Sequence, residues 1–133
     1  MTFPAKHISI GISSSKEAVY EFASNPANFP KWLAFVKTVE QASEQLWSAA
    51  TDAGNITIEM SPKNEFGVID HIVHLPDGAS IVNPLRVIGN NEGAEIIFTL
   101  FQLPGRTAGE LEQDAKLVSA DLETLKEILE VPA

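Results

Sequence analysis

Two polar residues, His71 and Asn83, interrupt stretches whose alternate positions are otherwise apolar, and they are the first candidates for chemistry. The Pro76–Gly78 turn between them predicts their pairing, because a left-handed Gly78 in a three-residue hairpin loop puts Leu75 opposite Ala79. In that register His71 faces Asn83 across the hairpin. Desolvation on an apolar face favours a neutral histidine, which can move a proton during enolisation or dehydration. Asn83 can orient that ring or polarise a carbonyl; the competing and favoured interpretation is a core hydrogen bond between His71 and Asn83 without chemistry.

The same pairing divides the two strands of this hairpin into an apolar face and a mixed face. The apolar face carries Ile69, His71, Val73, Ile81, Asn83, Leu85 and Val87. The mixed face carries Val68, Asp70, Ile72, His74, Val82, Pro84 and Arg86. If Asn90 pairs with Ala94 at the next turn, Ile97, Thr99 and Phe101 join the apolar face. The opposite face of that last strand then carries Ile96, Phe98 and Leu100, which is too apolar a set to leave wet without a reason.

Two explanations of that outer apolar set stay open. It is a subunit interface, which predicts a homodimer, or Pro84 sits at a bulge that swaps the faces beyond it. In the first case Arg86 stays on the surface as a weak ion-pair partner of Asp70. In the second it turns inward, where it would anchor a carboxylate or an enolate. The surface position is favoured by a small margin.

A metal site is not expected. Asp70, His71 and His74 are close in sequence, but side chains alternate along a strand, so the two histidines point to opposite faces. Asp70 and His74 share a face, and two ligands on a solvated surface make a poor site. The chain has no cysteine, no glycine-rich phosphate loop and no Ser–His–Asp ordering. We therefore expect neither a metal nor a cofactor.

Composition limits the classes of partner. The chain has 133 residues with 18 acidic and 9 basic side chains, a formal net charge of -9. This charge argues against nucleic acid and anionic membranes, which need clustered Lys and Arg. No apolar run approaches the roughly 20 residues of a membrane span, and the N-terminus lacks a secretory signal. We expect one cytoplasmic domain over residues 1–133.

The elements that position the candidates are a first strand, two short helices, six strands and a long helix. Ser14, with Glu17, is expected to cap the first helix, and Thr107, with Glu110, the last. The last helix carries an apolar stripe of Leu111, Ala115, Val118, Leu122, Leu125 and Leu129. The predicted strands are His7–Ile12, Val36–Gln41, Leu46–Thr51, Asn55–Ser61, Phe66–Leu75, Ser80–Gly89 and Ala94–Leu103. Short turns make the last six antiparallel neighbours, which is an α+β architecture.

Several segments, together with this element order, resemble one known family over essentially the whole chain. They are Val19–Phe22, Asn25–Trp32, Gly67–His71, Leu75–Gly78, Asn83–Val87, Phe98–Phe101 and Ala120–Lys126. The likeness is to the START-related, Bet v 1-like (SRPBCC) superfamily, and more closely to small bacterial polyketide cyclase/dehydrase-like members. The resemblance implies a helix-grip fold, in which a curved sheet wraps the C-terminal helix around an elongated, mostly apolar cavity. Members bind lipids, sterols, hormones, polyketides or aromatic compounds, some catalyse cyclisation or dehydration, and others are adaptors.

Three functions follow as hypotheses. The leading one is binding of a small hydrophobic or aromatic molecule between the long helix and the sheet. Its candidate ligand-binding residues are Trp32, His71, Asn83, Arg86, Thr99, Phe101, Val118 and Leu122. The second is a cyclase- or dehydratase-type enzyme with His71 as acid/base and Asn83, Thr99 or Arg86 orienting carbonyls. The third is a protein adaptor that uses the outer sheet face. A solvent-exposed His71 would exclude catalysis.

Overall fold

The computed structural model describes residues 1–130 and has the α+β architecture that the sequence predicts, with seven strands rather than six between the short helices and the long helix. The elements in chain order are β1 (Ala5–Ile12), α1 (Lys16–Ala23), the 3₁₀ turn η1 (Pro26–Asn28), α2 (Phe29–Trp32), β2 (Val36–Gln41), β3 (Leu46–Thr51), β4 (Gly54–Met60), β5 (His71–His74), β6 (Ser80–Asn83), β7 (Leu85–Asn90), β8 (Gly93–Phe101) and α3 (Ala108–Leu129). None of the helices in this described part is long and apolar enough to cross a membrane.

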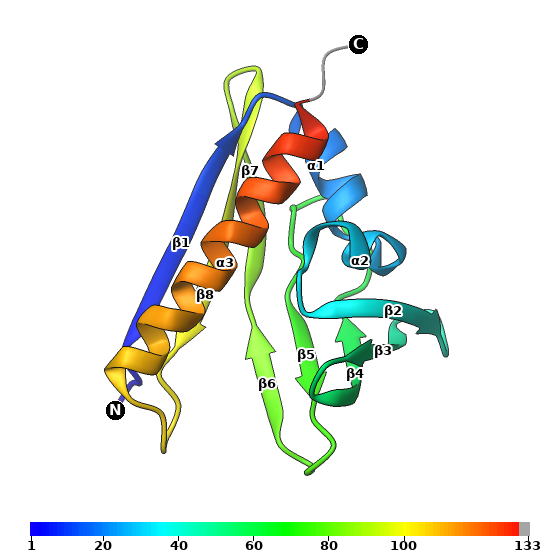
Figure 1. The fold of residues 1–133 in the computed structure, drawn as a ribbon. Helices are drawn as coiled ribbons and strands as arrows, with labels where there is room; N and C mark the ends of the chain where they lie inside the picture. Colours follow the sequence, from blue (N-terminus) through cyan, green and yellow to red (C-terminus); the bar gives the residue numbers. More distant parts are fainter. Residues whose placement is uncertain (131–133) are drawn as a thin grey trace.

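The strands form two antiparallel ladders, one ending at β6 and the other at β7, the next strand in the chain. Their orders are β1-β8-β7 and β2-β3-β4-β5-β6. The predicted register of the hairpin is confirmed, since His71 pairs with Asn83 and the Leu75 amide donates to the Ala79 carbonyl. An isolated bridge between Val68 and Arg86 continues the same register beyond β5 and β6. The two ladders therefore join into one curved sheet, which Figure 1 shows bending away from α3.

The single long strand predicted over Ser80–Gly89 is broken at Pro84, which separates β6 from β7. Proline has no amide hydrogen for the ladder. Beside the break, the Asp70 Oδ1 atom accepts the Leu85 amide at 2.9 Å and the Arg86 Nε at 3.0 Å, and Oδ2 accepts Arg86 Nη2 at 2.6 Å. The faces are not swapped beyond Pro84, because Leu85 is buried and Arg86 stays outside. The bulge explanation is therefore wrong.

The β7–β8 turn corrects the predicted faces of β8. Asn90 pairs with Gly93 rather than with Ala94, and Asn91 takes a positive φ of 54° in a two-residue turn. A shift of one residue moves every side chain of a strand to the other face. The inner residues of β8 are therefore Ala94, Ile96, Phe98 and Leu100, and the outer ones are Glu95, Ile97, Thr99 and Phe101. The predicted assignment of this strand was wrong throughout.

The long helix α3 begins as the sequence predicts. The Thr107 side chain accepts the Glu110 amide, and the Glu110 carboxylate accepts the Thr107 amide, which completes the capping box. Figure 1 shows α3 lying over β1 and β8, with the β2–β6 sheet curving away at its side. Leu122 and Leu125 are buried in the core, and Lys126 fastens the C-terminal end by donating to the Gly11 carbonyl.

One helix cap differs from expectation. Ser15 rather than Ser14 is the N-cap of α1, and its hydroxyl accepts the Ala18 amide at 3.1 Å. The helix buries Val19, Tyr20 and Ala23. The one-residue difference does not change which face of α1 meets the core.

Candidate functional site

Large apolar side chains on the inner side of the molecule are less buried toward one end of three elements. On α3, Leu125 and Leu122 are fully buried, whereas Val118 and Leu111 are half-buried, although the small Ala115 between them is buried. On β8, Ile96 is fully buried, whereas Phe98 and Leu100 are half-buried; on the hairpin, Ile69 is fully buried, whereas Leu75 and Ile81 are half-buried. The three elements therefore close into a core at one end and leave an open apolar cleft at the other.

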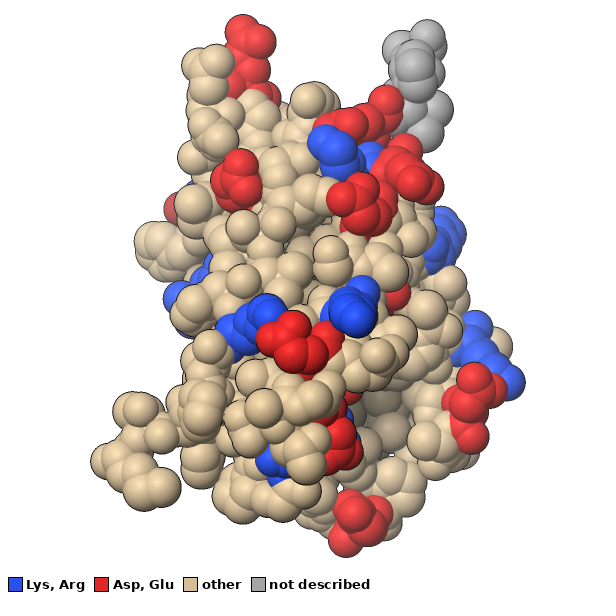
Figure 2. Space-filling model, turned by 60° about the vertical axis from the view of Figure 1, so that its left-hand side comes forward, with Lys and Arg blue, Asp and Glu red and all other residues tan. Residues whose placement is uncertain are grey.

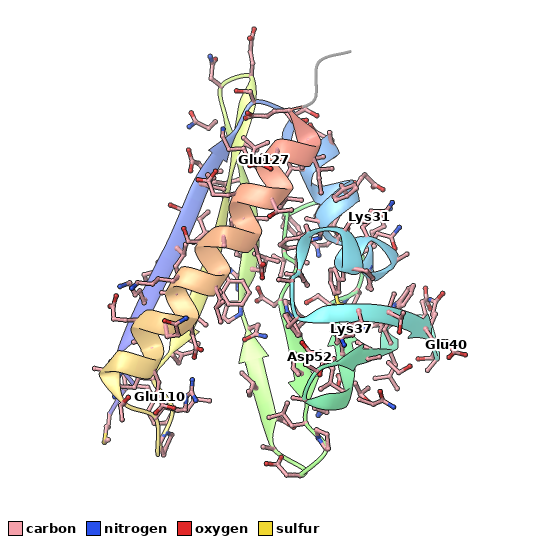
Figure 3. The ribbon with its side chains drawn as sticks, in the orientation of Figure 1. Lys31, Lys37, Glu40, Asp52, Glu110 and Glu127 are labelled. Atoms are coloured by element: carbon pink, nitrogen blue, oxygen red, sulfur yellow. The ribbon has the colours of Figure 1, made fainter. Side chains whose placement is uncertain are left out.

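The mouth of this cleft lies beside the N-terminal half of α3. Figure 2 shows the surface hollowed in its lower right part. Charged pairs stand around the opening: Arg106 bonds Glu110 and Asp114 at the helix end, and Lys37 bonds Asp52 at 2.6 Å on the opposite side. Figure 3 shows Glu110 at the lower end of α3 and the Lys37–Asp52 pair across the gap. The charges lie on the rim, and the walls below them are apolar.

His71 lies where the buried end of the cleft begins. It is the one polar or charged residue in the buried set of residues 1–130, with 7% of its surface exposed. Its neighbours across the sheet are Met60 on β4 and Asn83 on β6. The ring centroids of Phe29 and Phe98 lie 6.3 and 6.4 Å from that of His71. A histidine is thus held between two aromatic rings at the inner end of an apolar cleft.

Hydrogen bonding fixes the tautomer of His71. Its Nδ1 atom is 2.9 Å from the Ile69 carbonyl oxygen, which can only accept, so Nδ1 carries the proton. Burial lowers the pKa of His71 below its ordinary value, more than the Ile69 carbonyl and Asp70 raise it, so the ring is neutral near pH 7. The Nε2 atom then offers a lone pair. Among residues 1–130 it has no hydrogen-bond partner, and it is not among the fully enclosed polar atoms.

Trp32 supplies a second unused polar group. It is buried, and its ring meets that of Phe29 edge-on at 6.0 Å. Its Nε1 atom is fully enclosed and has no acceptor within the described part of the chain. An unpaired buried donor costs about 1–3 kcal/mol, so this N–H is a place where a bound polar atom would stabilise the protein.

The predicted site residues fall on both sides of the sheet. Trp32, His71, Asn83, Val118 and Leu122 all lie on the inner side. Arg86, Thr99 and Phe101 lie on the outer side, where Arg86 bonds Asp70 and the Thr99 hydroxyl bonds His7 Nδ1 at 2.9 Å. These last three residues do not face the cleft. The Asp70–Arg86 ion pair itself was predicted, and Arg86 holds the pKa of Asp70 below its usual range.

Sequence reasoning missed three residues of the site. The sequence predicts the wrong face for Phe98 on β8, and it does not single out Phe29 or Asp121 as site residues. Asp121 Oδ1 accepts the Ala34 amide at 3.2 Å, and burial raises the pKa of Asp121. The i to i+3 spacing of Asp121 from Val118 was the available signal.

A separate polar cluster lies on the outer face of the β4–β5–β6 ladder. His74 Nδ1 is 2.8 Å from the Ser80 hydroxyl, and its Nε2 is 3.1 Å from Glu59 Oε1. All three side chains are solvated. His71 and His74 therefore point to opposite faces, and residues 1–130 contain no group of three metal-ligating side chains.

Two hollows lie elsewhere on the surface. One of about 600 Å³ is bounded by Gly11–Ser13 and the β7–β8 turn. The other, of about 520 Å³, lies between α1 and the Lys63–Gly67 loop. Neither is between α3 and the sheet, and neither contains His71.

Comparison of structures finds proteins similar to this chain, whereas comparison of sequences finds none. Neither a family model nor a curated protein matches the chain. Solved structures match over nearly all of it. A START superfamily protein from Mycobacterium smegmatis gives a TM-score of 0.77 at 10% identity, covering 95% of this chain and 97% of that one. The chain has the START-like helix-grip fold.

Two further structures extend this comparison. The Aha1 dimer from Colwellia psychrerythraea gives a TM-score of 0.75 at 15% identity, over 96% of this chain and 97% of that one. The di-domain ARO/CYC protein BexL from the BE-7585A biosynthetic pathway gives 0.71 at 16% identity, over 93% of this chain and 45% of that one. The predicted helix-grip, α+β fold is confirmed; identities this low establish the fold and nothing finer.

Proposed function

We propose that this START-like protein binds a small hydrophobic or aromatic molecule in the cleft between α3, β8 and the β5–β6 hairpin. The observation that carries the proposal is the set of half-buried apolar side chains that these three elements turn toward one another. Val118, Phe98 and Ile81 belong to this set. Each Å² of apolar surface that a ligand covers contributes roughly 25 cal/mol. An apolar molecule is therefore the occupant that gains most from the cleft.

The structural comparisons agree with this proposal at the level of the fold. In helix-grip proteins the space between the long helix and the sheet is the expected ligand position, and the cleft occupies that place here. The similarity to BexL, a di-domain ARO/CYC protein from the BE-7585A biosynthetic pathway, is consistent with an aromatic occupant. The polar atom that would orient it is His71 Nε2, which is unbonded within residues 1–130 and is not fully enclosed.

A neutral fluorescent probe, N-phenyl-1-naphthylamine, tests the proposal. Its emission should rise on binding to the wild-type protein. Val118→Trp fills the cleft from α3 and should abolish the rise. Leu117→Trp, one residue away and 56% exposed, is the matched control and should bind like wild type. Equal binding by both variants would place the probe elsewhere and contradict the proposal.

A second candidate function is proton transfer during cyclisation or dehydration, with His71 as general base. The favouring observation is the neutral ring whose unbonded Nε2 adjoins the cleft. The burial of His71 leaves this hypothesis standing. A β-polyketone substrate distinguishes it from simple binding: His71→Gln should abolish turnover while the probe still binds. Absence of turnover in the wild-type protein would leave binding as the function.

A further inference from the structure

At the polar end of the cleft, the accessible atom is His71 Nε2, and it offers a hydrogen-bond acceptor and no donor. Because Nδ1–H of His71 donates to the Ile69 carbonyl, the accessible Nε2 atom can only accept. Asn83 lies directly across from it but makes no hydrogen bond to it within residues 1–130. A ligand atom that reaches Nε2 must therefore bring a hydrogen.

Charge excludes one large class of apolar ligands. No lysine or arginine among residues 1–130 is buried, and those at the cleft mouth, Arg106 and Lys37, are already bonded to carboxylates. Asp121, half-buried on α3, accepts the Ala34 amide and adds a carboxyl rather than a cation to this helix. A carboxylate or phosphate drawn into this cleft would lose its hydration without gaining a cation. Fatty acids and other organic anions are therefore poor occupants.

We infer that His71 selects an uncharged, ring-containing ligand that donates a hydrogen bond through a hydroxyl group to Nε2. This inference rests on the proposed binding function and narrows it to a chemical class. Phe98, which is half-buried, packs against the His71 ring and supplies an aromatic wall for a flat ligand body, and the fully buried Phe29 supports the same ring. The tautomer of His71 determines which ligands bind well. A ligand that has hydrogen-bond acceptors but no donor leaves the Nε2 lone pair unpaired and shielded from water.

A matched set of bicyclic probes tests the inference on the wild-type protein by calorimetry at pH 7. 2-Naphthol donates a hydrogen bond, 2-methoxynaphthalene has a similar shape but only accepts, and 2-naphthoate is an anion. 2-Naphthol should bind about tenfold more tightly than 2-methoxynaphthalene, the value of one buried hydrogen bond. 2-Naphthoate should bind more weakly than either.

Nitrogen NMR on histidine-labelled protein reports the contact directly. The chain has three histidines, His7, His71 and His74, so assignment is simple. The Nε2 resonance of His71 should move on adding 2-naphthol and stay in place with 2-methoxynaphthalene, while the other two histidines do not respond. His71→Phe, which keeps an aromatic ring but has no acceptor, should remove the preference for 2-naphthol, and His7→Phe, on the outer face, should retain it. If His71→Phe does not fold, the wild-type resonances decide.

The outcomes separate the inference from the function beneath it. If none of the three probes binds and N-phenyl-1-naphthylamine also fails, the proposed function is wrong. If the two neutral probes bind equally well, the cleft binds apolar molecules but the selection by His71 is refuted. Tighter binding of 2-naphthoate, or of the cationic 1-naphthylmethylamine, would overturn the inference in favour of a charged ligand.

Discussion

Phe98 lies directly opposite Leu85 in the β7–β8 ladder, and this pairing turns Phe98 toward His71 and Thr99 toward the outer face. The pairing decides which residues of β8 can meet a ligand. A register shifted by one residue would give the cleft Thr99 and Phe101 instead, with a hydroxyl in place of an aromatic wall.

Replacing Phe98 and Thr99 separately tests this register in solution. Phe98→Leu keeps most of the volume but loses the aromatic contact, which is worth about 0.5–1.5 kcal/mol. We expect binding of N-phenyl-1-naphthylamine to weaken about threefold to tenfold. Thr99→Ala should leave the affinity unchanged, because its side chain bonds His7 on the other face. The reverse pattern in a fluorescence titration would restore the alternative register.

The two hairpins show why one part of the site was predictable and another was not. The Pro76–Gly78 turn has one glycine, its φ is +92°, and the pairing of His71 with Asn83 followed from it. The Asn90–Gly93 turn offers several residues that tolerate positive φ, so loops of two and of three residues both fit the sequence. In the structure Asn91 takes the positive φ, and the face that each β8 side chain occupies depends on this turn.

The open cleft was beyond sequence reasoning for another reason. The apolar stripe of α3 predicts that the helix packs on the sheet, and Leu122 and Leu125 do so. The stripe cannot say how far along the helix the packing continues. Val118 and Leu111 belong to the same periodic pattern as Leu122, yet they are half-buried, although Ala115 between them is buried. Figure 1 shows the β2–β6 sheet curving away at the side of α3. That curvature is a property of the whole sheet.

Gly67 should be the glycine whose loss the fold tolerates least. Its φ is +74°, and a Cβ atom there would lie 2.1 Å from the Val87 carbonyl oxygen, at the joint between the two ladders. Gly78 has a φ of +92° but open space around its Cβ position. Gly78→Ala should therefore lose only about 1 kcal/mol, the cost of a left-handed alanine. Gly67→Ala should lose at least about 2 kcal/mol more in urea unfolding, since backbone must move. Equal losses of unfolding free energy in the two variants would show that the backbone between the two ladders can move to accept a Cβ atom at position 67.

Asp70→Asn should destabilise the strand break at Pro84, between β6 and β7. The carboxylate accepts the Leu85 amide and the Arg86 guanidinium, so its loss should lower the free energy of unfolding by about 1 kcal/mol at pH 7, given the partial exposure of the pair. Asp52→Asn, whose ion pair with Lys37 is mostly exposed, should change it little.

The effect of Asp70→Asn should also depend on pH. Hydrogen bonds from Arg86 lower the pKa of folded Asp70, so the stabilisation is present above the unfolded value of about 3.9 and is lost as pH falls through the lower folded value. Urea unfolding curves of variant and wild type should converge below about pH 4. If wild type and Asp70→Asn still differed as much in free energy of unfolding at pH 2.5, the charge of Asp70 would not be what stabilises the strand break at Pro84.

His71 should make the protein less stable in mild acid. Burial lowers the pKa of folded His71 below its ordinary value of 6.5, so between the two values the unfolded chain binds more protons than the folded one. Stability must then rise with pH through that window and fall as pH drops below 6.5, by up to about 1.4 kcal/mol per pH unit. His71→Gln should flatten the dependence of the urea midpoint between pH 7 and pH 5.5, and His7→Gln should retain the wild-type slope. An unchanged slope in His71→Gln would show that the folded ring accepts a proton freely, and a charged, solvated ring could not serve as the acceptor that the cleft presents to a ligand.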